Sequence, residues 1–131
     1  MNIFLTGASG FVGKNFISYF KSKFTIDIFK RERCFDINQD IVVHLAGKAH
    51  DTKNISSPED YYNVNTELTK NIFDNFLRSK AKVFIMLSSV KAVADSADKL
   101  LTENYKPDPK THYGKSKLLA EQYIFSKIIA E

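Results

Sequence analysis

The stretch Thr6-Gly7-Ala8-Ser9-Gly10-Phe11-Val12-Gly13 lies between a short apolar run and a segment whose apolar residues recur at helical spacing. The apolar run, residues 1–6, predicts a buried strand, and the segment after it predicts a helix with apolar residues from Phe11 to Phe20. In such a turn the first glycine permits a tight bend, the second keeps the backbone open, and the third lets the helix pack closely on the strand. The stretch therefore predicts the opening strand and helix of a parallel sheet.

The rest of the chain alternates short apolar runs with longer amphipathic segments. Strands are predicted at residues 24–29, 41–45 and 83–87, and helices at residues 59–79 and from 111 to the carboxyl terminus. The strands are continuously apolar, which is typical of a sheet covered on both faces. We expect an α/β fold with a doubly wound, Rossmann-like parallel sheet, in which ligands bind at the carboxyl ends of the strands. The connection at residues 33–39 is too short for a crossover helix of ~10 residues.

Composition and charge exclude several classes of protein. The 131 residues suffice for about one domain, and the single cysteine, Cys34, excludes a disulfide framework. The formal net charge of +4 comes from scattered lysines, so we expect no nucleic-acid partner. No apolar run approaches the ~20 residues of a membrane span, no signal peptide precedes the first strand, and no set of residues has metal-ligand spacing. We therefore expect a cytoplasmic protein with no membrane partner and no metal site.

The position of the glycine turn predicts a dinucleotide cofactor. The amino terminus of the following helix presents free N–H groups and a partial positive charge, which suit a pyrophosphate. The second strand ends in the basic run Lys30-Arg31-Glu32-Arg33 instead of the acidic residue typical of NAD enzymes. Basic side chains suit a 2′-phosphate, so the sequence slightly favours NADP and leaves NAD open. Asp36 and Ile37 are candidates for the adenine contact, and the small residues Ala46 and Gly47 would let the cofactor lie on the backbone.

A tyrosine and a lysine four residues apart predict an acid/base pair. At this spacing the two side chains share one helix face, and an ammonium stabilises the ionised form of a tyrosine. The spacing is not diagnostic alone, because it occurs three times, at Tyr19/Lys23, Tyr113/Lys117 and Tyr123/Lys127. Only Tyr113 opens a helix that follows both a strand ending in Ser88-Ser89 and a loop with two prolines. We therefore assign the chemistry to Tyr113 and Lys117.

Several motifs follow one another in order along the chain. They are the glycine turn at 6–13, His-Leu-Ala-Gly at 44–47, Asn63-Val64-Asn65, Ser88-Ser89, Pro107-x-Pro109, and Tyr-Gly-Lys-Ser-Lys at 113–117 with Ala120-Glu121. This ordered set covers nearly the whole chain and resembles the amino-terminal part of an extended short-chain dehydrogenase/reductase. It resembles in particular the NAD-dependent epimerase/dehydratase family, which acts on nucleotide sugars.

The resemblance implies roles for individual residues. Tyr113 would be the acid/base on a sugar hydroxyl or keto oxygen, and Lys117 would tune Tyr113 and hold the nicotinamide ribose. Ser89 would hydrogen-bond the reacting oxygen, with Ser88 beside it, and Asn65 would support the site. Hydride would pass between nicotinamide C4 and the sugar ring, so the implied catalytic residues are Ser89, Tyr113 and Lys117. The residues expected to contact NADP or NAD are Gly7, Ser9, Gly10, Phe11, Val12, Gly13, Lys30, Arg31, Asp36, Ile37, Leu45, Ala46, Gly47, Asn65, Ser88, Tyr113 and Lys117.

One departure from the family pattern narrows the expected chemistry. In the sugar-dehydratase branch an Asp-Glu pair typically follows the serine or threonine, whereas Val90 and Lys91 stand at those positions here. A nucleotide-sugar 4-epimerase or 4-keto reductase is therefore favoured over a dehydratase. A dinucleotide-binding module or regulator without turnover is the alternative, although such a module would need none of the three implied catalytic residues.

The helices and the length of the chain bear on its partners and completeness. The helices at 59–79 and 111–130 each carry two apolar stripes, where a surface helix needs only one. This predicts a homodimer through the two helices, with a wider core inside the chain as the alternative. The chain stops on the helix that carries Tyr113 and Lys117. We therefore expect residues 1–131 to form an incomplete NAD(P)-binding domain, without a carboxyl-terminal substrate lobe and with little activity, whose strand at 83–87 exposes an apolar edge.

Overall fold

The computed structural model describes residues 1–30, 35–48, 57–96 and 100–129. Contacts within the chain divide it into two compact units. Unit 1 comprises residues 1–46 and 71–87, and unit 2 comprises residues 47–70 and 88–131. The parallel sheet lies in unit 1, and the described part of unit 2 consists of helices and the loops between them.

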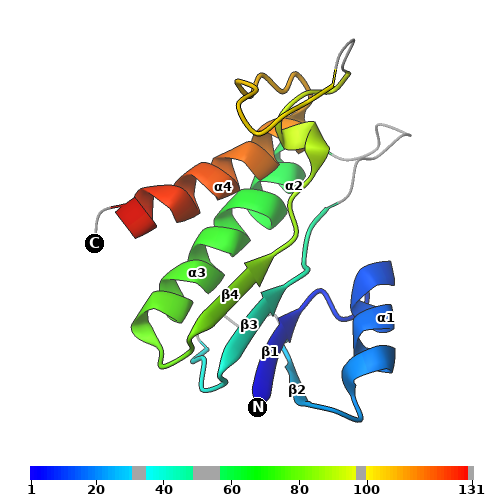
Figure 1. The fold of residues 1–131 in the computed structure, drawn as a ribbon, viewed down its shortest axis with the longest axis vertical. Helices are drawn as coiled ribbons and strands as arrows, with labels where there is room; N and C mark the ends of the chain where they lie inside the picture. Colours follow the sequence, from blue (N-terminus) through cyan, green and yellow to red (C-terminus); the bar gives the residue numbers. More distant parts are fainter. Residues whose placement is uncertain (31–34, 49–56, 97–99, 130–131) are drawn as a thin grey trace. The chain divides into compact units, whose positions relative to one another are not determined.

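The sheet of unit 1 has four parallel strands in the order β2-β1-β3-β4 (Figure 1). The strands are β1 (Asn2–Thr6), β2 (Thr25–Ile28), β3 (Ile41–His44) and β4 (Val83–Met86). The chain moves from β1 to β2 in one direction, and β3 then lies on the other side of β1. Ligands of open parallel sheets bind at the carboxyl ends of the strands beside such a reversal. The predicted α/β fold with a Rossmann-like sheet is therefore confirmed.

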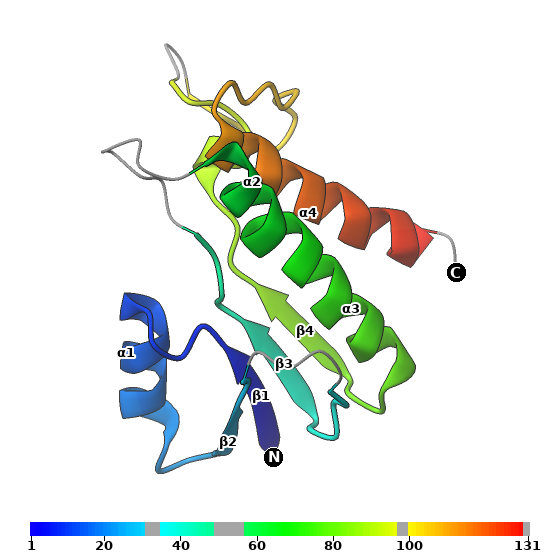
Figure 2. The ribbon, with the colours of Figure 1, turned by 180° about the vertical axis from the view of Figure 1, so that it is seen from behind.

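Helices cover both faces of this sheet (Figures 1 and 2). On one face Phe16 and Ile17 of α1 (Phe11–Phe20) pack against a cluster of Ile3, Leu5 and Val43. Side chains of successive strand residues alternate between faces. Residues of the other face therefore contact α3 (Leu68–Arg78), where the ring of Phe73 meets the ring of Phe84 edge-on at a centroid distance of 4.9 Å.

The connection from β2 to β3 contains no helix in its described residues, 29–30 and 35–40, as the sequence predicts. The aromatic rings of Phe4 and Phe35 stack with centroids 5.8 Å apart, and Phe35 also meets Phe29 edge-on at 4.9 Å. Ile37 is buried, with 5% of its surface exposed. Apolar contacts therefore hold this connection against the sheet in place of a crossover helix.

A continuous helical run begins in unit 2 and matches the helix expected over residues 59–79. It consists of α2 (Pro58–Tyr61), a π-helical segment η1 (Tyr62–Glu67) and α3, which continues into unit 1. Ser57 caps its amino terminus by accepting a hydrogen bond from the backbone N–H of Asp60. The π-helical segment was not predicted, because the apolar spacing was interpreted throughout as an α-helical period.

The second helical layer of unit 2 is α4 (His112–Ile129), which is preceded by a 3₁₀ turn, η2 (Val90–Ala92). The hydroxyl of Thr66 in η1 donates a hydrogen bond to the Ser116 carbonyl at 2.8 Å. The rings of Tyr61 and Tyr113 meet edge-on at 6.3 Å. Among the helices that the structure describes, none combines the length and the apolar character that crossing a bilayer requires.

Strand β4 forms one edge of the four-stranded sheet and exposes apolar side chains. Val83, Ile85 and Leu87 are 43%, 45% and 46% exposed. Phe84, whose side chain lies on the opposite face, packs against Phe73 and Phe76. The expectation of an exposed apolar edge at residues 83–87 is thus met for one of the two faces of the strand.

Candidate active site

The glycine turn of unit 1 follows β1 directly and has the backbone that the sequence predicts. Gly7 has a φ of 73°, a left-handed conformation that side chains other than glycine rarely adopt. A β-carbon on Gly7 would lie 2.5 Å from the backbone nitrogen of Ala46, and one on Gly13 would lie 2.1 Å from the Gly7 carbonyl oxygen. Gly7 and Gly13 are therefore required for the close approach of β1, α1 and the end of β3.

The same turn leaves room for a phosphate group. A β-carbon on Gly10 would meet only the Gly7 carbonyl oxygen, at 3.4 Å, among the described residues. Gly10 is the N-cap of α1, and it has no side chain to occupy the free N–H groups of the first turn, which also lacks an acidic residue. Ser9, Phe11 and Val12 are exposed around it. This open cradle at a helix amino terminus fits a dinucleotide pyrophosphate.

The ends of β1 and β3 are joined by a buried hydroxyl. Thr6 Oγ1 accepts a hydrogen bond from the backbone N–H of Ala46 at 3.1 Å and lies 2.7 Å from Nδ1 of His44. His44 is 1% exposed, so it belongs to the core and is not available to a ligand. Leu45 and Ala46 are half-buried directly after β3. The small residue at 46 therefore lies beside the glycine turn, at the carboxyl end of the sheet.

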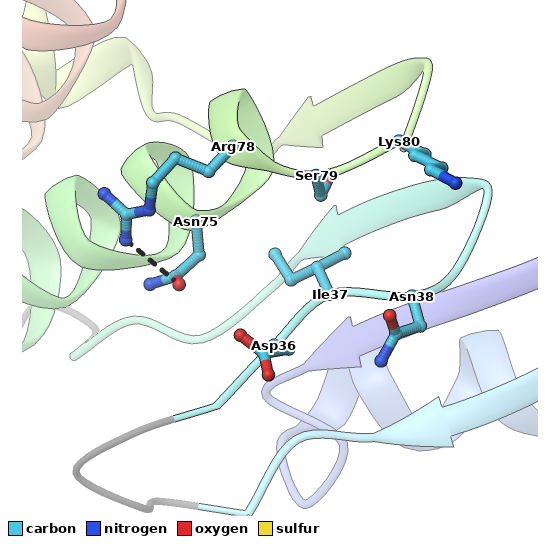
Figure 3. Close-up of a pocket in the computed structure, with 7 residues that line it drawn as sticks. All are labelled: Asp36, Ile37, Asn38, Asn75, Arg78, Ser79 and Lys80. Atoms are coloured by element: carbon cyan, nitrogen blue, oxygen red, sulfur yellow. Dashed lines mark hydrogen bonds between the residues drawn. The ribbon is translucent and has the colours of Figure 1, made fainter.

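The structure describes some of the residues that are predicted to contact the adenosine end of the cofactor. Lys30 is exposed after β2, and Arg31 lies outside the described residues. Asp36, Ile37 and Asn38 line a pocket of about 330 Å³ together with residues at the end of α3 and in the turn that follows it, namely Asn75, Arg78, Ser79 and Lys80 (Figure 3). No residue of the glycine turn lines this pocket. The adenine contact expected at Asp36 and Ile37 stays a prediction.

Burial distinguishes the three tyrosine–lysine pairs. Lys23 lies over the Tyr19 ring at 4.4 Å and Lys127 over the Tyr123 ring at 5.4 Å, and both lysines are exposed. Lys117, by contrast, is only 6% exposed. Tyr113 is half-buried, in the first turn of α4. The position in the chain that selects Tyr113 and Lys117 in the sequence therefore also selects the one buried lysine among the three pairs.

The Lys117 ammonium lies in an unusual environment for a lysine. Burial lowers the pKa of Lys117 below its ordinary value, and the charge of Glu121, one helical turn on, offsets part of this effect. Glu121 in turn accepts a hydrogen bond from the hydroxyl of Ser88. A buried lysine with a perturbed pKa is a frequent mark of a functional site.

The remaining candidate residues of unit 2 are Ser89, Asn65 and Gly47. Ser89 is half-buried and caps η2, because its Oγ accepts a hydrogen bond from the backbone N–H of Lys91 at 3.2 Å, which leaves its own proton available to donate. Asn65 is 1% exposed, and its Nδ2 donates to Oγ of Ser116 at 3.0 Å. A β-carbon on Gly47 would lie 3.3 Å from Oδ1 of Asn65. Unit 2 thus gathers Asn65, Gly47 and the helix of Tyr113 through hydrogen bonds and close packing.

Sequence reasoning missed Asp95, which binds the residues just before Tyr113. Its carboxylate accepts hydrogen bonds from Lys110 and Thr111, and Asp95 lies in a loop where no periodic pattern signals a contact. The described residues contain no group of three or more His, Cys, Asp or Glu that could hold a metal ion.

Comparisons with known proteins agree with these features. The model of the NAD dependent epimerase/dehydratase family matches residues 23–127. The chain is 33% identical over 143 residues to N-acetyl-alpha-D-glucosaminyl-diphospho-ditrans,octacis-undecaprenol 4-epimerase of Escherichia coli O157:H7, a match that covers 94% of the chain and 42% of that protein. It is 30% identical over 141 residues to GDP-6-deoxy-D-talose 4-dehydrogenase of Aggregatibacter actinomycetemcomitans, with coverage of 95% and 47%.

The fold is also found among solved structures. The structure of RMD from Pseudomonas aeruginosa complexed with NADPH matches with a TM-score of 0.77 and 25% identity, covering 98% of this chain and 50% of that one. The chain spans less than half the length of the two curated relatives. Because the family match extends over most of the sequence, the chain belongs to the NAD dependent epimerase/dehydratase family.

Proposed function

We propose that residues 1–131 are the NAD(P)-binding and catalytic part of a nucleotide-sugar 4-epimerase or 4-keto reductase. The observation that carries this proposal is the burial of Lys117 four residues after Tyr113, in a chain that also has an open glycine cradle. A bound nicotinamide would supply or accept hydride at the sugar ring. The glycine turn would hold the pyrophosphate, and Lys117 would hold the nicotinamide ribose.

Tyr113 exchanges a proton with the substrate in this proposal, and Ser89 hydrogen-bonds the reacting oxygen. When a sugar hydroxyl is oxidised, its proton passes to the Tyr113 oxygen as hydride leaves the same carbon, and reduction of a keto group reverses both transfers. The Ser89 hydroxyl donates a hydrogen bond to the reacting oxygen, since its own oxygen is already engaged by Lys91. The positive charge of Lys117 stabilises the ionised form of Tyr113.

The names of the two curated relatives support chemistry at position 4 of a sugar. One is a 4-epimerase and the other a 4-dehydrogenase, and each name specifies a sugar carried on a diphosphate. Neither Val90 nor Lys91 has a carboxylate, so neither supplies an acid or a base for water elimination. Val90 is 65% exposed, and the side chain of Lys91 donates to the carbonyl of Asp95. The first of these names specifies an undecaprenol carrier, so a lipid-linked sugar diphosphate is the second substrate to test.

The cofactor is NADP or NAD, with NADP slightly favoured by Lys30 and Arg31. The family description names NAD, whereas one similar structure was solved with NADPH. The preference is tested by titrating the protein with NADPH and with NADH and following cofactor fluorescence. Lys30→Ala should weaken NADPH binding and leave NADH binding unchanged if the basic run binds the 2′-phosphate.

The alternative, a binding module without turnover, is separated from the enzyme by a matched pair of variants. Tyr113→Phe should abolish turnover of UDP-, GDP- or dTDP-sugars and keep cofactor affinity within about twofold, because the ring is retained. Tyr123→Phe removes the same hydroxyl from the same helix at the same spacing to a lysine, and it should leave turnover unchanged. Tight cofactor binding by the intact gene product, with no turnover of any of these sugars, would support the module instead.

We also propose a homodimer through η1, the start of α3 and α4. A groove of about 370 Å³ on this face is lined by Tyr62, Thr66, Glu67, Lys70, Leu119, Gln122, Tyr123 and Ser126. Leu119, Phe125 and Ile128 of α4 are 44%, 59% and 57% exposed. Phe125→Glu should convert a dimer to a monomer in light scattering, and a monomeric parent at high concentration would refute the dimer. We further propose a cytoplasmic location with no nucleic-acid partner and, if the substrate is a nucleotide sugar, no membrane partner.

A further inference from the structure

The carboxylate of Asp95 binds the chain at the start of α4. Its Oδ2 accepts hydrogen bonds from the backbone N–H groups of Lys110, at 2.5 Å, and Thr111, at 3.0 Å. Its Oδ1 accepts a third hydrogen bond from the Thr111 hydroxyl at 2.7 Å. Three donors on two consecutive residues therefore converge on one carboxylate, which fixes its orientation.

The hydrogen-bond chain continues to the residue after Tyr113. The Thr111 Oγ1 that donates to Asp95 also accepts a hydrogen bond from the backbone N–H of Gly114 at 3.1 Å. Thr111 thereby satisfies one of the free N–H groups at the amino terminus of α4, as a capping residue does. The Gly114 nitrogen belongs to the peptide bond that leaves Tyr113, so Asp95 is connected through Thr111 to the backbone of Tyr113.

Asp95 is also the last residue of the segment that carries Ser89. We call residues 88–95 the serine segment. The Lys91 ammonium donates to the Asp95 carbonyl at 2.7 Å, and the Asp108 N–H donates to the Val93 carbonyl at 2.8 Å. A β-carbon on Gly114 would lie 2.3 Å from the Lys91 carbonyl oxygen. The serine segment therefore packs directly on the first turn of α4 at several points, and Asp95 supplies the side-chain connection.

From this arrangement we infer that Asp95 is a positioning residue, which fastens the serine segment to the first turn of α4 and thereby sets Ser89 relative to Tyr113. The inference rests on the proposed function, because it concerns the two hydroxyls assigned there to one reaction. Asp95 itself touches no reacting atom in this assignment. It acts through Thr111 and through the backbone of the serine segment.

The first experiment tests the connection without any assay of activity. Backbone and side-chain NMR signals of the 131-residue chain are compared for the parent, Asp95→Ala and Asp108→Ala. Asp108 is the matched control, because it lies in the same loop and its carboxylate binds the exposed side chain of Lys110. In Asp95→Ala we expect the signals of Ser89 and Tyr113 both to shift and broaden, and in Asp108→Ala we expect neither to do so.

A conservative variant separates positioning from a general loss of fold. The amide of Asp95→Asn can still accept from the two backbone N–H groups with its oxygen and donate to Thr111 Oγ1 with its nitrogen, so we expect it to restore most of the parent signals. Thr111→Ser keeps the hydroxyl and should behave like the parent, whereas Thr111→Val should resemble Asp95→Ala. If Asp95→Ala, or Thr111→Val should Asp95→Ala fail to fold, changes only residues 110–114 and leaves Ser89 unmoved, Asp95 is merely a helix-capping partner and the inference is wrong.

The second experiment measures the consequence for the reaction. In the protein that turns over sugar, Asp95→Ala should lower kcat roughly 10- to 100-fold with cofactor affinity unchanged, and Asp95→Asn should recover much of the loss. A parent protein that binds cofactor without turnover would refute the proposed enzymatic activity. The NMR result would still decide whether Asp95 fixes the position of Ser89 relative to Tyr113. An equal loss of cofactor affinity and kcat would contradict a positioning role.

Discussion

Asn65 donates a hydrogen bond from Nδ2 to Oγ of Ser116 at 3.0 Å, one residue before Lys117. The same side chain accepts from the Lys48 backbone N–H at 2.7 Å and donates to the Lys48 carbonyl at 3.1 Å. Asn65 is almost fully buried, so each of these partners would lose a hydrogen bond in a dry environment if the amide were removed. One amide thus joins the residue after Gly47, the π-helical segment and α4 within unit 2.

Replacing Asn65 should therefore destabilise unit 2 more than its size suggests. For Asn65→Leu we expect the free energy of unfolding to fall by about 2–4 kcal/mol, since backbone groups of Lys48 are left unpaired beside an apolar side chain. Asn63→Leu, two residues earlier and exposed, should change it by less than about 0.5 kcal/mol. Urea denaturation followed by circular dichroism measures both, and equal effects would contradict the hydrogen-bond argument.

Substitutions at Gly7 and Gly10 should separate effects on stability from effects on cofactor affinity. Gly7→Ala places a β-carbon 2.5 Å from backbone atoms at a φ of 73°, and should cost about 3 kcal/mol or more of stability. Gly10→Ala meets only a carbonyl oxygen at 3.4 Å, and should cost less than about 1 kcal/mol. Cofactor affinity should nevertheless fall about tenfold or more in Gly10→Ala, because its methyl group would occupy the pyrophosphate site. Unchanged NADPH and NADH titrations for Gly10→Ala would place the cofactor elsewhere.

Lys117 should contribute to function at a cost in stability. Burial lowers the pKa of Lys117, so the unfolded chain binds this proton more tightly than the folded chain does. We expect Lys117→Met to leave the free energy of unfolding unchanged or to raise it by about 1 kcal/mol at pH 7, and to abolish turnover. The gain should shrink as the pH rises through 10.5, because above this value the parent lysine loses its proton in both states. Lys115→Met, on the exposed side of the same helix, is the control.

Acid should release the start of α4. Partial burial works to raise the pKa of Asp95, but the hydrogen bonds from Thr111 and from the backbone of Lys110 and Thr111, with the charge of Lys91, bring it below its ordinary value of 3.8. A carboxylate with a lowered pKa stabilises the fold above its unfolded pKa, and this contribution is lost as the pH falls through the lower, folded value. The amide signals of Thr111 and Gly114 should therefore change below about pH 3.8 and stay constant above it.

The charged groups facing Asp95 decide how this acid titration is run. The Lys91 ammonium donates to the Asp95 carbonyl, and the Lys110 backbone N–H donates to the Asp95 carboxylate. Asp108 is a second carboxylate in the same loop and pairs with Lys110, so the titration is performed in an Asp108→Asn background. A transition that persists when Asp95→Asn is added would show that another group is responsible.

The exposed face of β4 should promote self-association. Val83 and Ile85 are nearly half exposed on an edge strand, where apolar side chains and unpaired backbone groups favour pairing with another chain. Ile85→Thr keeps the β-branched shape and should lower the apparent mass in concentration-dependent light scattering. Phe125→Glu tests the separate surface on α4, so a decrease caused only by Phe125→Glu would exclude β4 as the contact.

The features that were predicted correctly depend on local sequence. The strands were located to within one or two residues because β1, β3 and β4 each contain a short apolar run, whereas β2 alternates isoleucine with polar residues. The turn conformation at Gly7 followed from the spacing of three glycines. The absence of a crossover helix from the described residues between β2 and β3 followed from the length of the connection alone. The choice of Tyr113 and Lys117, which stays a prediction, depended on their place after a strand and a proline-bearing loop.

The features that were missed depend on contacts between distant residues or on an unusual helix geometry. Asp95 lies 16 residues before Thr111 in a loop without periodicity, so its role is visible only once the two segments meet. The π-helical segment at Tyr62–Glu67 produces an apolar spacing close to that of an α-helix, which is why the two could not be told apart.

That π-helical segment has a consequence for how the chain tolerates insertions and deletions. A π turn spans more residues than an α turn, so it can be regarded as an α-helix with an extra residue accommodated in place. Removing one residue between Tyr62 and Glu67 would restore regular α-helical hydrogen bonding and keep the flanking turns in phase, but it would turn the residues within the segment around the helix axis. Helix content would be preserved while Asn65, or the residue that replaced it, turned away from Ser116. The length of this segment is therefore as tightly constrained as the identity of the asparagine within it.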